Sequence, residues 1–367
     1  MAEYPWACGP SEEKKLTVDV TPAKAGVHVS PEGAGFPFAR EGPVRADFLE
    51  SPGAGDTPRR SAMTAWLIKV LTLCLLNVAA ALLLSPLFEG LMRKLRAAIH
   101  SRIGPPIKQP YWDILKLLGK EDLRTTGGVV YASLPALTLG SVLLLAALVP
   151  MGTGAPLAFA GDLIVVLYVA AMSSVLLMLA GFASASPYAS IGSSREMMML
   201  LSVEPTLAIA LAVGAFKAGT LTLGGIVNWQ VQNGPSISMA IGGLAFFLAL
   251  QAVAGKLPFD VAEADQEIMG GSLVEQSGPR LALFRWAMWT KQLVLALLLV
   301  QVFFPWPHYG IYPIDLLLTM VKVLVVLILV TVVDVVNPRL RIDQAMGYFM
   351  RVAVSSLAAL AFAVIGK

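Results

Sequence analysis

The sequence has 367 residues, of which 56% are apolar (AVILMFWYC) and 14% charged, with a mean hydropathy of +0.72. Soluble domains hold about 45–50% apolar and about 25% charged residues, so this composition indicates a polytopic membrane protein and excludes disordered, collagen-like and disulfide-scaffold classes. The net charge of +3 is too small to indicate nucleic-acid binding. Two cysteines, Cys8 and Cys74, are too few to ligate an iron–sulfur cluster within this chain alone. The histidines are scattered, which argues against a histidine metal cage: His28, His100 and His308.

Residues 1–62 differ in composition from the rest of the chain. They hold 7 Lys and Arg, 9 Asp and Glu, 8 Pro and 7 Gly, and this density of helix breakers predicts a disordered extension. No apolar segment follows a basic start, so the extension does not resemble a signal peptide. Two interpretations stay open: translation starts at Met63, or residues 1–62 are a soluble tail ahead of a membrane domain over residues 63–367.

Eight apolar segments follow, each near the length of about 20 residues that a helix needs to cross about 30 Å of hydrocarbon. Only helices and closed barrels satisfy the backbone within lipid, and these segments are too long for barrel strands. The sequence therefore predicts an all-α membrane protein with eight transmembrane helices. The absence of a clear internal repeat disfavours an inverted-repeat transporter. The predicted spans are 65–88, 132–150, 161–184, 198–217, 237–254, 284–304, 312–335 and 348–366.

Basic residues concentrate in the loops on one side of the predicted bundle. The loops after the first, third, fifth and seventh spans carry 15 Lys and Arg, whereas the opposite side carries only Lys217 and Lys367. Because cytoplasmic loops are enriched in Lys and Arg, we expect these four loops to face the cytoplasm.

The first of these loops contains a rigid turn and then an amphipathic helix. Pro105 and Pro106 fix φ in the turn and remove two backbone donors. Over residues 109–121, Trp112 and Leu115 fall on one helical face and polar residues fall on the other. Such a helix lies in the membrane interface, either as a surface anchor or as a wall of a partner-docking or substrate cavity. The loop residues that we assign to partner docking are Arg102, Gly104, Pro105, Pro106, Gln109 and Pro110.

The second loop leads into the fourth span with Arg195 and Glu196, which we also assign to partner docking. Glu204 lies nine residues beyond Arg195, about 13 Å deeper at about 1.5 Å per residue. A carboxylate at that depth is costly unless it is paired, hydrated or protonated, and Pro205 frees a backbone carbonyl one turn back. Glu204 is therefore a candidate for proton transfer, with a satisfied structural pair as the alternative.

The third loop is the most informative because five acidic residues lie within sixteen positions of it. On a helix, Glu263 and Glu267 would share a face. Like charges and burial both raise carboxyl pKa values, so this cluster is suited to hold and pass protons near neutral pH. A solvated acidic surface and a carboxylate metal site are the alternatives. The five residues are Asp260, Glu263, Asp265, Glu267 and Glu275.

The fourth loop is a short polar elbow, in which we assign Arg339, Arg341 and Asp343 to partner docking. Inside the spans, Lys291 and Lys322 lie near mid-depth. Together with Glu204 and the acidic loop, these lysines place ionisable groups at several depths, as expected for a proton path across a bundle.

The third loop closely resembles the signature of a known family. Residues 256–267 read KLPFDVAEADQE and are followed by a glycine-rich stretch over 270–278. They are similar to the membrane-anchor subunit shared by respiratory complex I, where it is subunit 1, and membrane-bound nickel–iron hydrogenases. The resemblance covers about residues 63–367, includes the eight spans, and extends to all four loops in order.

Two loops resemble the hydrogenase branch of this family. Residues 102–110 read RIGPPIKQP, whereas the quinone-linked form has a longer insertion at this place. The elbow NPRLRIDQ is also similar to the hydrogenase form, since the quinone branch usually has a tyrosine where Ile342 stands. The resemblance thus favours the group of hydrogenase-4 component C and formate hydrogenlyase subunit 4.

This resemblance implies a non-catalytic subunit in a prokaryotic cell membrane, without a cofactor or metal of its own. Its expected partners are hydrogenase large and small subunits carrying the nickel–iron centre, a ferredoxin-like iron–sulfur subunit and antiporter-like membrane subunits. The alternative is the quinone-binding subunit of a proton-pumping NADH:quinone oxidoreductase, and a stand-alone transporter is disfavoured. The residues that we assign to a proton relay are Glu204, Asp260, Glu263, Asp265, Glu267, Glu275, Lys291 and Lys322.

Overall fold

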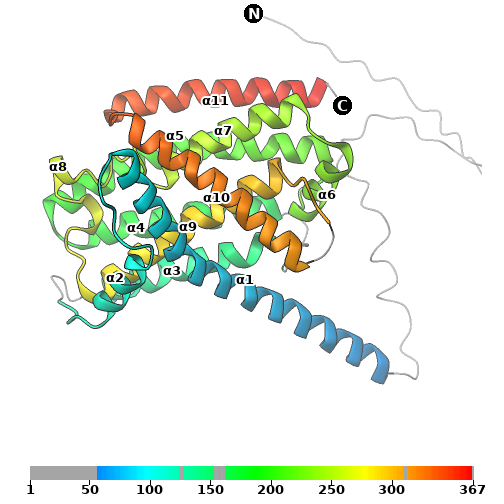
Figure 1. Ribbon diagram of the computed structural model, residues 1–367, viewed down its shortest axis with the longest axis horizontal. Coiled ribbons are helices and arrows are strands. Elements are labelled where there is room, and N and C mark those ends of the chain that lie inside the picture. Colours follow the sequence, from blue (N-terminus) through cyan, green and yellow to red (C-terminus); the bar gives the residue numbers. More distant parts are fainter. Residues whose placement is uncertain (1–55, 124–127, 153–156, 158–161, 310–311, 366–367) are drawn as a thin grey trace, which may run out of the picture. The chain divides into compact units, whose positions relative to one another are not determined.

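A computed structural model describes residues 56–123, 128–152, 157, 162–309 and 312–365, except the side chains of 56–67, 265 and 312–313. Within these residues all regular structure is helical (Figure 1). The helices are α1 (Asp56–Ile99), α2 (Gln109–Leu118), α3 (Val129–Leu148), α4 (Asp162–Ala183), α5 (Pro187–Ala218), α6 (Leu223–Asn233), α7 (Ile237–Val253), α8 (Asp265–Ile268), the 3-10 helix η2 (Gly271–Leu273), α9 (Gly278–Phe303), α10 (Tyr312–Val336) and α11 (Ile342–Ile365).

The predicted all-α membrane fold is confirmed, and each of the eight apolar segments coincides with a helix over nearly all of its described residues. Among the described residues, seven helices are long and apolar enough to cross a membrane: α1, α3, α4, α5, α9, α10 and α11. The remaining predicted span is α7, which has 17 residues and is about 25 Å long. The exact count of eight spans therefore stays a prediction.

Two helices extend beyond their predicted limits. Helix α5 begins at Pro187 instead of residue 198, because proline is well suited to the first helical position and Ser186 before it has extended backbone. Arg195 and Glu196 consequently lie inside the helix and not in the loop before it. Helix α1 begins at Asp56, within the segment predicted to be an extension. Residues 1–55 lie outside the described residues, so the division at residue 62 stays a prediction.

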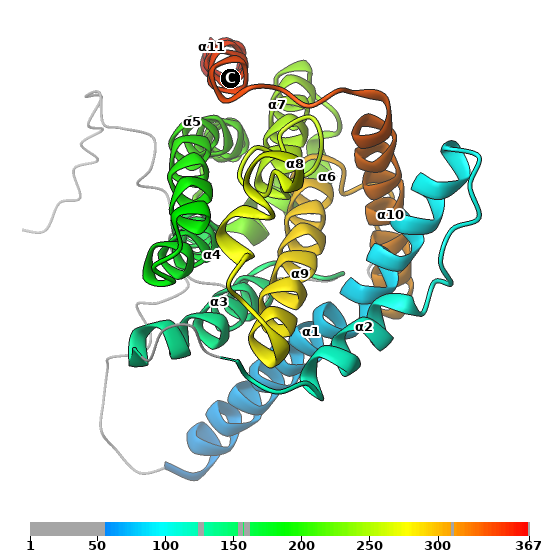
Figure 2. The same cartoon turned by 90° about the vertical axis from the view of Figure 1, so that its left-hand side faces the viewer.

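Helix α9 occupies the centre of the bundle (Figure 2). In its most apolar 18-residue window, 89% of the residues are buried, because α1, α3, α7 and α10 all pack against it. Helix α11 lies along α5 and α7, and α4 packs between α3 and α5 (Figure 1). The polar side chains of Thr290, Lys291, Gln292 and Gln301 on α9 are therefore held inside the protein.

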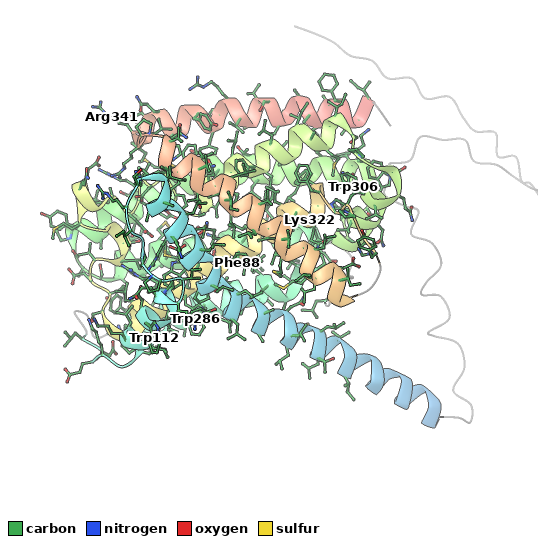
Figure 3. All side chains as sticks on the ribbon, in the orientation of Figure 1. Phe88, Trp112, Trp286, Trp306, Lys322 and Arg341 are labelled. Atoms are coloured by element: carbon green, nitrogen blue, oxygen red, sulfur yellow. The ribbon has the colours of Figure 1, made fainter. Side chains whose placement is uncertain are left out.

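The alternating directions of the helices bring the four basic loops to one end of the bundle, which Figure 2 views. Helix α2 is at this end, with Ile114 buried against the bundle. The predicted apolar face of α2 points the other way, since Trp112 is 63% exposed and Leu115 60% exposed (Figure 3). This face is free for lipid or a partner, as both interpretations of the amphipathic helix require.

Candidate functional site

The acidic loop between α7 and α9 packs against α5 through glycines. Gly271 has φ +59°, and a Cβ atom there would lie 1.9 Å from the Ala262 carbonyl oxygen. A Cβ atom on Gly192 of α5 would lie 2.6 Å from the Gly271 Cα. No side chain fits at either position, so the two backbones meet directly and hold residues 260–263 against the membrane helices.

The same loop is tied to α10 and to the elbow between α10 and α11. The Leu257 backbone N–H donates to the Asp334 carboxylate at 3.0 Å. The Leu340 N–H donates to the Pro258 carbonyl at 3.0 Å. Because three separate elements fix its backbone, the loop presents its carboxylates in set directions.

Glu263 faces inward from this loop, beside Asp260. Burial raises the pKa of Glu263 to about 8, and the negative charges of Asp260 and Glu196 add to the rise. Lys256 and Arg285 oppose it. A carboxyl with this pKa is mostly protonated at neutral pH. That the acidic loop holds and passes protons stays a prediction.

Glu267 does not share a helical face with Glu263, and this expectation is wrong. Residues 260–264 are not helical, with a turn at 262–263, and a helix begins only at residue 265, after Ala264 with φ −48° and ψ +86°. Glu267 points outward and pairs with Arg195 Nη1 at 2.6 Å and with Arg339 Nη1 at 4.0 Å. These arginines lower the pKa of Glu267, the hydrogen bond from Arg195 contributing most.

The other two acidic residues of the loop are less engaged with the interior. The Glu275 side chain is half-buried and lines none of the described cavities, although its backbone carbonyl accepts a hydrogen bond from the Tyr131 hydroxyl at 3.3 Å. Asp265 begins α8, but its side chain lies outside the described part of the structure. Their assignment to the relay stays a prediction.

Glu196 and Lys291 interact electrostatically inside the bundle and share Ser174 as a hydrogen-bond partner. Lys291 lies on α9 about 20 Å along the helix from its start, is 7% exposed and interacts electrostatically with Glu196 and Glu204. Its Nζ donates to Ser174 Oγ at 2.6 Å, and Glu196 also hydrogen-bonds Ser174. The structure thus places Glu196, predicted to dock a partner, beside a relay residue. Ser174 was missed, although a Ser–Ser pair inside an apolar span was the available signal.

Two small cavities connect these groups. The first, of about 40 Å³, is lined by Asp260, Glu263, Glu196 and Lys291 together with Ser174. The second, of about 30 Å³, is lined by Glu204 and again by Ser174, among apolar side chains. The first has room for one or a few water molecules beside several polar partners, and the second has room for about one, with Ser174 and Glu204 as its polar lining residues. The structure therefore brings together four of the predicted relay residues: Glu204, Asp260, Glu263 and Lys291.

A larger cavity lies between the acidic loop and the first half of α9. It has a volume of about 400 Å³, enough for about a dozen water molecules. Asp260 and Glu263 line both this cavity and the inner one. The remaining polar residues of its lining are Lys256, Gln276, Arg285 and Gln292. A polar chamber and a narrow inner cavity thus share the same two carboxylates.

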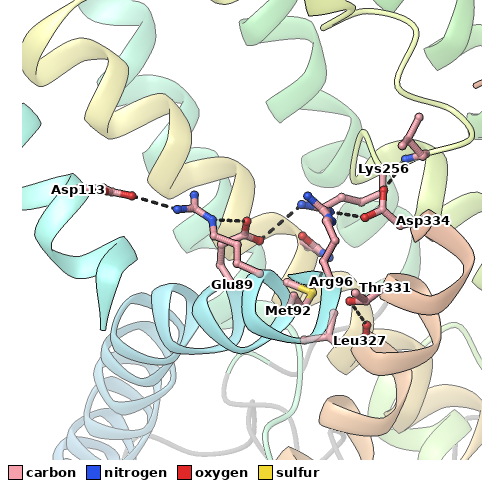
Figure 4. Close-up of polar contacts among 11 residues, drawn as sticks. Glu89, Met92, Arg96, Asp113, Lys256, Leu327, Thr331 and Asp334 are labelled. Carbon is pink, nitrogen blue, oxygen red and sulfur yellow. Dashed lines mark hydrogen bonds and ion pairs between the residues drawn. The ribbon is translucent and has the colours of Figure 1, made fainter. Parts of the chain in front are cut away.

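An ion-pair network beside this chamber was not predicted (Figure 4). Glu89 of α1 is 5% exposed and pairs with Arg93 at 3.1 Å and Lys256 at 3.5 Å. Arg93 also pairs with Asp113 of α2 at 3.0 Å. Arg96 pairs with Asp334, whose other oxygen accepts from the acidic loop. The i, i+4 spacing of Glu89 and Arg93 could have predicted the first pair. The other pairs join different segments of the chain, so they depend on the tertiary structure and have no local sequence signal.

The predicted docking residues are mostly at the surface of the end that carries the acidic loop. Arg341 is exposed, and Figure 3 shows it at the edge of this end. Arg195 and Arg339 are half-buried, since both also donate to the Val261 carbonyl, at 3.5 Å and 3.3 Å. Pro110 is buried. The exposed or half-buried remainder comprises Arg102, Gly104, Pro105, Pro106, Gln109 and Asp343.

Lys322 lies apart from the other relay residues. Its Nζ donates to the Pro305 carbonyl at 2.7 Å and the Pro307 carbonyl at 3.3 Å, in the loop between α9 and α10. Figure 3 shows it on the Trp306 side of the molecule, away from Arg341. Lys322 therefore stabilises the loop between α9 and α10, and it does not line the cavities around Lys291.

No group of three or more His, Cys, Asp or Glu side chains among the described residues is arranged to hold a metal ion. The carboxylate metal site, kept open from the sequence, finds no support in that part of the chain. That the chain binds no cofactor stays a prediction.

The chain is similar to the members of one known protein family. The profile of the family described as NADH dehydrogenase matches residues 71–365. Hydrogenase-4 component C of Escherichia coli (strain K12) is 36% identical over 265 residues, which are 69% of this chain and 83% of that protein. Formate hydrogenlyase subunit 4 of the same organism is 34% identical over 270 residues, 71% of this chain and 87% of that protein.

A solved structure shares the fold. One chain of the membrane-bound sulfane sulfur reductase, described as an archaeal respiratory membrane complex, superimposes with a TM-score of 0.74 at 30% identity. The superposition covers 80% of this chain and 99% of that chain. The similarity therefore extends over nearly the whole described bundle.

Proposed function

Because this chain belongs to the NADH dehydrogenase family, we propose that it is the membrane-anchoring and ion-coupling subunit of a membrane-bound nickel–iron hydrogenase complex. The identities of 36% and 34% to a hydrogenase component and a formate hydrogenlyase subunit support this branch. The chain is a multi-pass membrane protein, and its basic loops at one end face the cytoplasm by the charge rule.

The observation that carries the proposal is a series of three cavities, in which the outer two share Asp260 and Glu263 and the inner two share Ser174. Protons in the outer chamber reach Asp260 and Glu263, which also line the inner cavity with Glu196 and Lys291. The next cavity holds Glu204 near the middle of α5. Ionisable groups buried at successive depths are expensive in a membrane protein unless a path requires them.

The docked hydrogenase arm would drive this path electrostatically. Electron transfer to protons in the arm changes the charge beside the acidic loop. A carboxyl with a pKa near the ambient pH, such as Glu263, responds strongly to such a change by binding or releasing a proton. That proton then enters or leaves the inner cavity, from which antiporter-like subunits receive the signal.

The proposed partners supply the redox chemistry. Hydrogenase large and small subunits would hold the nickel–iron centre, and a ferredoxin-like subunit would hold iron–sulfur clusters. The docking face comprises α2, the elbow and the surface around Glu267. Two arginines there are already engaged by Glu267, whereas Arg341 and Arg102 are exposed for acidic groups of a partner.

Two substitutions test this function in the intact complex. Glu263→Gln and Glu204→Gln remove a proton-binding group with little change in volume, so we expect proton translocation in vesicles to fall by more than about tenfold. Hydrogen evolution from an artificial reductant should persist. Glu121→Gln, at an exposed carboxylate, is the matched control. Unchanged translocation in both relay variants would contradict the relay.

The alternative is a quinone-binding subunit, and the chamber argues against it. A quinone ring with an isoprenoid tail needs a largely apolar slot, whereas charged and amide side chains dominate the chamber under the acidic loop. Purified complex distinguishes the two functions. A hydrogenase complex evolves hydrogen and resists quinone-site inhibitors, and a quinone-linked complex does the reverse.

A further inference from the structure

Ser174 of α4 lies at the meeting point of the buried charges. Its side chain is inside the bundle, and the residue is 4% exposed. Lys291 Nζ donates to Ser174 Oγ at 2.6 Å, and Glu196 hydrogen-bonds the same hydroxyl. One hydroxyl group therefore stands between an ammonium and a carboxylate contributed by two other helices.

The chemistry of the two neighbours sets the direction of this hydrogen-bond chain. A lysine ammonium has three donors and no acceptor, so Ser174 Oγ can only accept from Lys291. An ionised carboxylate only accepts, so the Ser174 O–H donates to Glu196. The resulting order, ammonium to hydroxyl to carboxylate, is the arrangement that lets a proton move without rotation of any heavy atom.

Ser174 also joins the two inner cavities. It lines the cavity of Glu263, Glu196 and Lys291, and it lines the cavity of Glu204. Val253 is the other residue common to both, and it is apolar. Ser174 is therefore the polar group that the two linings share, and a proton passing between them meets its hydroxyl.

We propose that Ser174 is a proton-passing residue between the outer carboxylates and Glu204. The proposal rests on the relay function proposed above and adds to that relay a residue that carries no charge. In the forward step Glu196 takes the hydroxyl proton of Ser174 while Ser174 takes one from the Lys291 ammonium. The products are neutral Glu196, an intact hydroxyl and neutral Lys291. Glu263, which lines the same cavity, restores the Lys291 proton through cavity water. Ser174 then takes the proton from neutral Glu196 and gives its own to Glu204 through a water of the second cavity. One proton has then moved from Glu263 to Glu204, and Glu196, Ser174 and Lys291 are back in their starting states.

The neighbouring serine supplies a matched control. Ser173 is 3% exposed and lines the same first cavity, but its hydroxyl donates to the Ala170 carbonyl of its own helix at 2.8 Å. Ser173→Ala and Ser174→Ala therefore remove the same group at the same depth. Threonine and valine at Ser174 form a second pair, equal in shape and different only in the hydroxyl.

The experiment measures proton translocation per hydrogen evolved, with the whole complex reconstituted in vesicles. We expect Ser174→Ala and Ser174→Val to lower this ratio about tenfold or more, and Ser174→Thr and Ser173→Ala to leave it within about twofold of the wild type. A solvent isotope effect on translocation should rise only in the variants without the hydroxyl. These results would support a conducting hydroxyl and not a merely structural one.

Two outcomes separate this proposal from the function on which it rests. If Ser174→Ala and Ser174→Val translocate normally while Glu204→Gln does not, the relay stands and Ser174 has no part in it. If Glu204→Gln and Glu263→Gln also translocate normally, the relay itself is wrong. Equal losses for Ser174→Thr and Ser174→Val would show that shape, and not the hydroxyl, is what matters, and would overturn the proposal.

Discussion

The pKa of Glu263 gives the sharpest prediction of the structure. Burial is the largest cause of its rise from 4.5 to about 8, and Asp260 adds to it while Lys256 opposes it. Replacing Asp260 by Asn removes a like charge, so the pKa of Glu263 should fall. Replacing Lys256 by Met removes an opposite charge, so the pKa should rise.

The size of the effect follows from the titration curve. A carboxyl with a pKa of about 8 is about 90% protonated at pH 7 and about 10% protonated at pH 9. Removal of the Asp260 charge should lower the midpoint and removal of the Lys256 charge should raise it, because the first opposes ionisation of Glu263 and the second favours it. Coupled proton translocation should decline as the pH rises through each midpoint, because the group then no longer holds a proton to donate.

The assay is an infrared titration of the purified complex. The C=O stretch of a protonated carboxyl is assigned to Glu263 by its absence in Glu263→Gln, and its intensity is followed with pH in the three backgrounds. Opposite shifts in the two charge variants would support the electrostatic account. A band that is already lost near pH 5, or shifts of the same sign in both variants, would refute it.

Three other substitutions test the framework around the site. Asp334→Asn should lower the unfolding free energy by about 2 kcal/mol, seen as a lower melting temperature in detergent, because it weakens the ion pair and hydrogen bond of a buried carboxylate, whereas Asp343→Asn at an exposed site should not. Gly192→Ala should cost about 1–3 kcal/mol because a Cβ there meets the backbone of the acidic loop at 2.6 Å, whereas Gly140→Ala has no atom within 4 Å. Glu267→Gln should keep most proton translocation in vesicles, because this carboxylate is exposed and pairs with arginines; a loss as large as that of the Glu263 variant would contradict the division between the two.

Hydropathy predicted the helices well because it depends on local composition. Each apolar segment coincides with a helix over nearly all of its described residues, as 237–254 does with α7 and 348–365 with α11. The predicted ends of the helices were less accurate where polar residues of a helix face the interior of the protein. Residues 187–197 contain serines, an arginine and a glutamate, and they read as a loop, yet α5 runs through them because Gly192 and Ser193 are buried against neighbouring segments.

Depth along a span could be predicted, whereas the neighbours of a residue could not. Lys291 and Lys322 looked alike in the sequence, each near the middle of an apolar run. Their helices differ in position: α9 is surrounded by other helices, so Lys291 meets Glu196 and Ser174. Lys322 on α10 reaches the carbonyls of the preceding loop instead. Which residue faces which depends on the packing of all the helices together.

Glu263 faces the inner cavity and Glu267 faces the surface, and the residues between them connect the docking face to the relay. Glu267 is held by Arg195 and Arg339, and both arginines donate to the carbonyl of Val261, two residues before Glu263. A partner that competes for these arginines would therefore act on the backbone of the turn that carries the inner carboxylate. Loss of Glu267 alone leaves both arginines able to donate to Val261, so we expect the carboxylate to be dispensable for conduction while the arginines hold the position of the turn.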